Sequence, residues 1–351
     1  MSAEHSYVTF GLAPAMRAGG VLSGGDYQVH RDFLDFIVDG RPLLLRLADL
    51  DAVSPLASDL GPSILTAQVR RLLLETEPPP AHSRYVIYGC PECEGLGCGA
   101  VTAVIERDGT DIVWRDFVWQ TDERADLARN GYPGIGPFRF RGEQYRAELE
   151  RLLADGVPGH RRRVLLIGRR VELLARLAAA LRTIGIGAEI TRDAAGAHAD
   201  ELRTYGAVAF GRSVDGEERA AVHRAFEAAG SDAVFVERPA PIVPLLVAQM
   251  EQALDRSPYD RRRLGALSAS TEGVTLEVTA PCRVRLIAYR VDRFRRTHTH
   301  ELFDGRLEPG RRLIEADRKA LKGESYVVAR TAGSVLVAPV RDTPPAETPD
   351  R

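Results

Sequence analysis

The sequence predicts a multidomain α/β and β protein. We expect an N-terminal α+β domain, a small Rossmann-like parallel α/β domain and a C-terminal antiparallel, immunoglobulin-like β-sandwich. Strand-like and helix-like segments alternate over residues 163–254, which is typical of βαβ units around a parallel sheet. Short apolar–polar alternations separated by turn residues fill residues 273–340, which is typical of a sandwich.

Linker-like segments set the expected domain boundaries. Residues 155–159 contain Pro and Gly, residues 257–260 contain Pro, and each segment is followed by a run of arginines. Such stretches commonly join domains. The predicted domains are residues 1–157, 160–256 and 262–341. The Pro-rich end, residues 342–351, is expected to be disordered.

The first domain shows a mixed pattern. Residues 33–38 and 42–47 resemble a strand pair turned at Asp39-Gly40, and residues 100–107 and 111–117 resemble a hairpin turned at Asp108-Gly109. Helical spacing of apolar residues predicts helices over residues 63–74 and 143–153. Residues 84–88 are expected to form a further strand.

The second and third domains differ in the period of their apolar residues. In the second, we expect strands at 164–167, 188–191, 207–210 and 233–236, and helices at 171–181, 197–204, 217–229 and 242–254. In the third, the expected strands are 273–280, 283–291, 325–330 and 334–340. His298 and His300 would share one face of a further strand and could chelate an ion, but two ligands bind weakly, and a solvent-facing strand is favoured.

Composition narrows the function classes. The chain has 351 residues, of which 27% are charged and 44% hydrophobic, with a formal net charge of −2. This balance gives no general basic field for nucleic acid, and no apolar run approaches the ~20 residues of a membrane helix. We therefore expect a cytoplasmic protein with neither nucleic acid nor a membrane as partner.

Arginine needs a cautious interpretation in this chain. Lys319 and Lys322 are the only lysines among its 47 basic residues, so 45 of them are arginines. Such a bias, together with abundant Ala, Gly and Leu, suggests a GC-rich genome. An isolated arginine therefore says little about function.

Three of the four cysteines fall in one short run, as Cys90, Cys93 and Cys98. Their thiolates could hold zinc, but a closed structural site needs a fourth ligand, for which the spacing selects none of Cys282, His82 and Asp116. Cys90 and Cys93 could instead form a redox pair, although the motif leads into a strand rather than a helix. A glycine-rich turn with reduced, partly buried thiols is the third interpretation.

Several motifs resemble a group of uncharacterised bacterial, largely actinobacterial, proteins. The matching residues are the cysteine turn 89–98, the strand Val113-Trp114-Arg115-Asp116-Phe117, the segment Gly136-Pro137-Phe138-Arg139-Phe140, and Gln144, Tyr145 and Leu149 in the following helix. The resemblance covers residues 30–153. This chain has one residue more between its first two cysteines, and the group implies no particular activity.

The second domain offers an anion site. Arginines follow its strands as Arg169 and Arg170, Arg212 beside Ser213, and Arg238, where parallel strands end and helix N-termini present N–H groups. These residues could hold a phosphate or carboxylate, although solvated surface arginines are the more common case. The glycines of a dinucleotide fingerprint and the acidic residues of a Mg²⁺ site are absent from this sequence.

The motifs support two functions. The sequence has no Gly-x-Ser-x-Gly, P-loop or His-Glu-x-x-His motif, so we expect a non-catalytic binding or scaffold protein that recognises a protein partner or a small anionic ligand. The alternative is an oxidoreductase that uses the Cys90/Cys93 dithiol or a cofactor bound atypically in the second domain. Only analogy with other folds supports that alternative.

Overall fold

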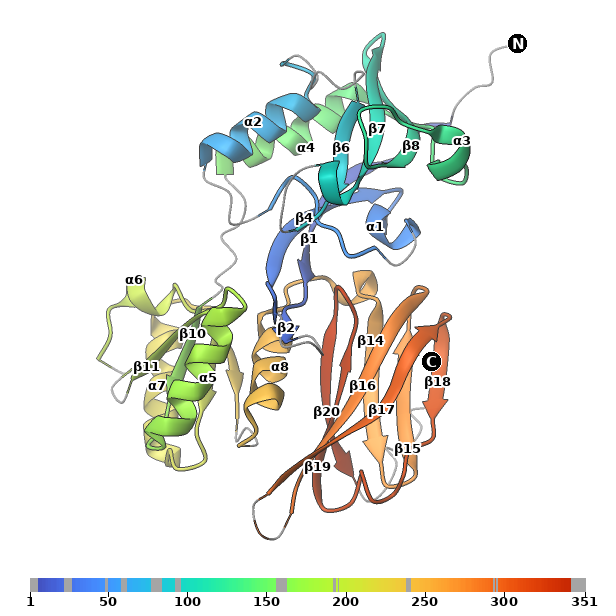
Figure 1. Ribbon diagram of the computed structural model, residues 1–351. Coiled ribbons are helices and arrows are strands. Elements are labelled where there is room, and N and C mark those ends of the chain that lie inside the picture. Colours follow the sequence, from blue (N-terminus) through green and yellow to red (C-terminus); the bar gives the residue numbers. More distant parts are fainter. Residues whose placement is uncertain are drawn as a thin grey trace, which may run out of the picture. The chain divides into compact units, whose positions relative to one another are not determined.

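Figure 1 shows the computed structural model of the chain. It describes residues 6–21, 27–47, 50–57, 62–76, 84–91, 96–155, 163–191, 194, 196–237, 241–292, 294 and 296–341. The chain forms two compact units. The N-terminal unit comprises Met1–Arg17, Arg31–His160 and Arg256–Arg261, and the C-terminal unit comprises Ala18–His30, Arg161–Asp255 and Arg262–Arg351.

The N-terminal unit is built from antiparallel sheets and helices. One sheet has the order β1-β4-β5 and the other the order β6-β7-β8-β9. The strands are β1 (Phe10–Arg17), β4 (Arg31–Val38), β5 (Arg41–Pro42), β6 (Arg84–Gly89), β7 (Ala100–Asp108), β8 (Asp111–Gln120) and β9 (Phe138–Phe140). The helices are α1 (Leu43–Arg46), α2 (Pro62–Leu72), α3 (Leu127–Asn130), α4 (Gly142–Asp155) and the 3-10 turn η1 (Leu96–Cys98).

An aromatic cluster forms the core of the N-terminal unit. The Trp114 side chain is fully buried, and its ring centroid lies 5.2 Å from that of Phe36 and 5.7 Å from that of Phe140, both in edge-on contact. The rings of Phe10 and Tyr145 complete the cluster. Edge-to-face contacts add to the stabilisation that burial gives, so strands β1, β4, β8 and β9 and helix α4 share one core.

The elements predicted for the N-terminal unit are confirmed with one exception. The hairpin of β7 and β8 turns at Asp108–Asp111 as expected, and helices α2 and α4 lie where the apolar spacing placed them. The predicted strand over residues 42–47 is wrong: only Arg41–Pro42 pairs, and Leu43–Arg46 form a helical turn. Consecutive leucines lack the β-branching that favours strands, and leucine is a good helix former.

The parallel sheet of the C-terminal unit confirms the alternation read from the sequence. Its order is β11-β10-β12-β13, with all neighbours parallel. Helices α5 and α8 cover one face and α6 and α7 the other, because each pair shares a core with alternate side chains of β10 and β12. The elements are β10 (Arg163–Ile167), α5 (Val171–Thr183), β11 (Gly187–Thr191), α6 (Ala199–Leu202), β12 (Ala207–Phe210), α7 (Gly216–Ala228), β13 (Val234–Val236) and α8 (Val243–Leu254).

The rest of the C-terminal unit is one curled sheet, with the order β17-β16-β19-β20-β14-β15-β18 (Figure 1). Its strands are β14 (Leu264–Ser270), β15 (Gly273–Val278), β16 (Cys282–Val291), β17 (Thr297–Leu307), β18 (Gly310–Ile314), β19 (Glu324–Arg330) and β20 (Val335–Arg341), and the 3-10 turn η2 (Tyr259–Arg261) precedes them. The expectation of an immunoglobulin-like sandwich is therefore wrong. Instead of facing sheets, one continuous sheet curls around a single core, with β14 and β20 joined by a parallel pairing.

The two compact units do not test the predicted division into three domains. Residues 161–255 and 262–351 belong to the same unit, and the segment Ala18–His30, with the hairpin β2 (Gly20–Val21) and β3 (Tyr27–Gln28), belongs to it as well. The three-domain division stays a prediction, and the predicted disordered tail lies outside the described residues. None of the helices in the described ranges is long and apolar enough to cross a membrane.

Candidate anion-binding site

The candidate site lies where strands β10 and β12 end. β10 is followed by a connection that leads to β11 on one side, and β12 lies on its other side, so the two strands flank a topological switch point. Gly168 and Gly211 come directly after them. A Cβ atom at Gly168 would lie 3.4 Å from the Gly211 Cα atom, and the backbone N–H of Arg169 donates to Ser213 Oγ at 3.4 Å. The two loops are therefore held close together.

A small pocket of about 40 Å³ opens between these loops. Its floor is apolar and its rim is polar. The lining residues are Gly168, Arg169, Arg170, Leu173, Leu174, Leu177, Ala209, Gly211, Arg212, Ser213, Pro241 and Leu246. A single water needs roughly 10–15 Å³ on this scale, so the pocket has room for a group of a few heavy atoms, such as a phosphoryl or carboxylate group.

Helix α5 begins at this pocket without a side-chain cap. Its N-cap residue, Arg170, makes no side-chain hydrogen bond to the first turn. Helix α7, which follows β12, differs because its N-cap residue Asp215 accepts a hydrogen bond from the backbone N–H of Glu218. The unpaired N–H groups of a helix's first turn attract anions. In α5 the N–H of Val171 already donates to the Arg169 carbonyl oxygen at 3.2 Å, so the helix has only the remaining N–H groups of its first turn to offer a ligand, whereas α7 is already capped.

The arginines around the pocket differ in their partners. The side chains of Arg169 and Arg170 are exposed and make no ion pair with any carboxylate in the described part of the chain. Arg212 instead forms an ion pair with Glu324 of β19, and both side chains are 44% exposed. The hydrogen bond that Arg212 donates to the Glu324 carboxylate raises the pKa of Arg212. Two of the three charges are thus available to a ligand, and the third is already neutralised.

The structure brings together four of the five residues that the sequence predicted for this site. Arg169, Arg170, Arg212 and Ser213 line one pocket, whereas Arg238 lies outside the described residues. Sequence reasoning missed Glu324, because the pairing of β19 with distant strands carries it to this edge. It also missed the apolar floor, formed by residues such as Leu173 and Leu246 whose helical spacing marks them only as core.

The cysteine run does not assemble a metal site among the described residues. Cys90 is half-buried at the end of β6, Cys98 is exposed in η1, and Cys93 and the candidate ligand His82 lie outside the described residues. Asp116 forms an ion pair with Arg115, and Cys282 is buried in the core of the seven-stranded sheet. No group of three potential ligands occurs in the described ranges, so the zinc and dithiol assignments stay predictions.

The two histidines lie on a strand, as expected. His298 and His300 are both half-buried in β17. The His298 Nε2 atom lies 3.0 Å from Asp292 Oδ2, so this histidine has a carboxylate partner of its own. The described residues around the histidines offer no third ligand that would complete a metal site.

Comparison of the chain with protein-family models, with curated proteins and with solved structures found no match. The resemblance of residues 30–153 to an actinobacterial group therefore stays a prediction.

Proposed function

We propose that this chain is a non-catalytic binding protein whose C-terminal unit recognises a small ligand carrying a phosphate or carboxylate group. The pocket at the switch point between β10 and β12 carries this proposal. In Rossmann-like sheets, to which we assign residues 160–256, ligands bind outside the carboxyl ends of the strands at such a point. The proposal therefore places the ligand where both the topology and the arginines converge.

The chemistry of the rim favours an anion. Arg169 and Arg170 offer planar guanidinium groups, which bind phosphate or carboxylate oxygens through paired hydrogen bonds. The uncapped N-terminus of α5 adds N–H donors and the positive end of the helix dipole. The pocket admits the anionic group alone, because its floor is closed by Leu173, Leu174 and Leu246. The remainder of the ligand would lie over the exposed rim.

Thermal unfolding in the presence of inorganic phosphate tests the proposal. A ligand that binds only the folded state raises the melting temperature in proportion to the logarithm of its concentration. We expect phosphate to raise the melting temperature of the wild-type protein, and the double variant R169Q/R170Q to lose most of that shift. Sodium chloride at matched ionic strength corrects for screening.

A matched control removes the same charge elsewhere. Arg176 of α5 and Arg224 of α7 are exposed and do not line the pocket, so R176Q/R224Q should keep the phosphate shift. An equal loss in both double variants would show general charge attraction and would contradict a site. The absence of any shift in the wild-type protein at millimolar phosphate and adenosine monophosphate would do the same.

The redox alternative stays a prediction of the sequence. Its first form needs Cys93, which lies outside the described residues. Its second form needs a cofactor site in the second domain, and the pocket there, of about 40 Å³, is too small for one. We therefore favour recognition of an anion.

A further inference from the structure

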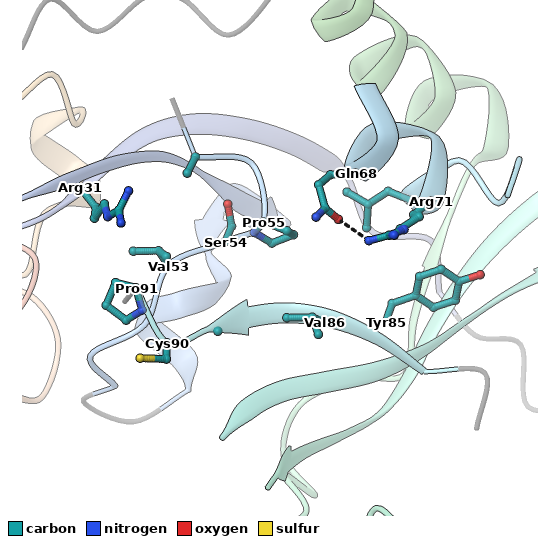
Figure 2. A pocket seen from close by; sticks show the side chains of 13 residues that line it. Arg31, Val53, Ser54, Pro55, Gln68, Arg71, Tyr85, Val86, Cys90 and Pro91 are labelled. Atoms are coloured by element: carbon teal, nitrogen blue, oxygen red, sulfur yellow. Dashed lines mark hydrogen bonds between the residues drawn. The ribbon is translucent and has the colours of Figure 1, made fainter. Parts of the chain in front are cut away.

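A second cavity lies in the N-terminal unit, between helix α2, strand β6 and the segment 53–57 (Figure 2). The backbone of Val53 pairs with Gly89 at the end of β6 through hydrogen bonds of 3.0 and 2.9 Å. A bridge between Ala57 and Phe33 of β4 holds the other end of the segment. These contacts fix the segment above the strand and leave the cavity beneath it.

The cavity has the size of a small ring and a largely apolar wall. Its volume is about 160 Å³, and a cavity of about 150 Å³ with apolar walls is large enough for a benzene-sized molecule. The lining residues are Arg31, Val53, Ser54, Pro55, Ala57, Gln68, Arg71, Leu72, Tyr85, Val86, Gly89, Cys90 and Pro91. Burying a ring-sized apolar body against such residues is favourable.

The charged residues of the wall are all basic. Arg31 and Arg71 line the cavity, and none of the other lining residues is acidic. Figure 2 shows Gln68 and Arg71 together at one end and Arg31, Pro91 and Cys90 at the other. The side chain of Arg71 is exposed, and its hydrogen bond to Gln68 Oε1 is long, at 3.4 Å. Unlike Arg115, Arg139 and Arg146, Arg71 makes no ion pair with the carboxylates that the structure describes, and among such unpaired arginines Arg71 lines the cavity.

We propose that this cavity binds a small organic acid with an apolar body about the size of a six-membered ring. The apolar body lies against Val53, Leu72 and Val86, and the carboxylate pairs with Arg71 at the mouth. Such a ligand uses both features of the cavity, because an apolar molecule alone would gain nothing from the guanidinium group of Arg71, and a small inorganic anion would leave the apolar wall in contact with water. The site is separate from the pocket of the C-terminal unit and does not depend on it.

Calorimetric titration with phenylacetate tests this assignment, with neutral phenylacetamide as the comparison ligand. We expect phenylacetate to bind and phenylacetamide to bind about three- to fivefold more weakly, since only the acid can pair with the exposed Arg71. The variant R71Q should weaken phenylacetate binding by a similar factor and leave phenylacetamide binding unchanged. The neighbouring Arg70 is exposed and does not line the cavity, so R70Q is the matched control and should bind phenylacetate as the wild-type protein does.

Cysteine alkylation locates the bound acid. Under reducing conditions, phenylacetate should slow the alkylation of Cys90, which lines the cavity, and leave that of the exposed Cys98 unchanged; peptide mass mapping separates the two. Titration of R169Q/R170Q excludes binding at the other site, and failure of phosphate to bind there would leave the present assignment untouched. Equal affinity for acid and amide, equal effects of R71Q and R70Q, or no binding of phenylacetate at millimolar concentration would each overturn the proposal.

Discussion

Two clusters in the C-terminal unit, one around Glu251 with a single arginine and one with Arg169 and Arg170, have different roles. At the first, Arg330 Nη2 donates to Glu251 Oε2 at 2.7 Å, and Glu251 is completely buried. At the second, Arg169 and Arg170 stand exposed on the rim of a pocket. Both clusters contain arginine, in which this chain is unusually rich. Only in the second are the arginines exposed and without a carboxylate partner among the described residues, so that they can bind a ligand.

In the cluster around Glu251, both carboxylate oxygens have hydrogen-bond partners and are not available to a ligand. The backbone N–H of Gly19 donates to Glu251 Oε1 at 2.6 Å, and the His30 Nδ1 atom lies 3.3 Å from the same oxygen. Arg330 also donates to the carbonyl oxygen of Gly19. These bonds attach the segment 18–30 to helix α8 and strand β19, so this cluster organises the fold.

The difference shows how arginines can be interpreted in such a chain. The number of arginines says nothing about their function, whereas the burial of each arginine and its partners do. A buried pair with complete hydrogen bonding has a structural role and is costly to break. Exposed arginines without carboxylate partners, gathered at a concave point of the fold, are candidates for binding.

The largest effect is expected from Glu251→Ala. This change removes the fully buried carboxylate partner of the half-buried Arg330 and of the Gly19 N–H. Breaking a fully buried pair typically costs about 3–5 kcal/mol, and the partial exposure of Arg330 places the expected loss at the lower end, at about 3 kcal/mol. Urea unfolding followed by far-UV circular dichroism measures the loss. Glu227 of α7 is exposed and is not in an ion pair with any described residue, so E227A serves as the control and should change stability by well under 1 kcal/mol. Similar losses in the two variants would remove the distinction between the buried and exposed clusters.

A smaller loss of stability is expected at acidic pH. Burial alone would raise the pKa of Glu251, but the charge of Arg330 and the hydrogen bond from His30 outweigh it and lower the pKa below the ordinary value of 4.5. As the pH falls below about 4.5, the unfolded chain takes up a proton that the folded chain does not, so the free energy of unfolding decreases. Each unit of pKa difference contributes about 1.4 kcal/mol.

The variant E251Q isolates this contribution. Glutamine does not titrate, so the free energy of unfolding of E251Q should fall less steeply than that of the wild-type protein between pH 4.5 and lower values. E227Q should keep the wild-type slope. Parallel curves for the wild-type protein and E251Q would show that the carboxylate of Glu251 is not preferentially ionised in the folded state.

Much of the architecture around the pocket could be predicted from the sequence. The alternation of apolar strands with helices determines a parallel sheet, and parallel strands bring the residues after Ile167 and Phe210 to the same edge. The convergence of Arg169, Arg170 and Arg212 follows from that. The hairpin of β7 and β8 was equally accessible, because Asp108-Gly109 is a strong local turn signal.

Contacts between residues far apart in the sequence could not be predicted from it. Alternation of apolar and polar residues indicates which side chains of a strand are buried, but not which strand lies beside it. The parallel pairing of Ala269 with Val340 therefore could not be predicted, and a sandwich was expected instead. The Glu251 cluster joins residues far apart in the chain, and a lone Glu on an apolar helix does not reveal its partners. The cavity beside Cys90 depends on the segment 53–57, which has no periodicity to interpret.

The smallest effect on stability, and the sharpest test of the comparison, is expected from Glu324→Gln. The ion pair of Glu324 with Arg212 is exposed, so its loss should cost at most about 1 kcal/mol. Because the change releases the third arginine of the rim, phosphate should bind more tightly, by about two- to fivefold. E301Q breaks an equally exposed pair with Arg285 in the same sheet, away from the pocket, and should leave phosphate binding unchanged. Weaker or unaltered binding in E324Q would mean that Arg212 does not face the ligand, and the site would then consist of Arg169, Arg170 and the N-terminus of α5.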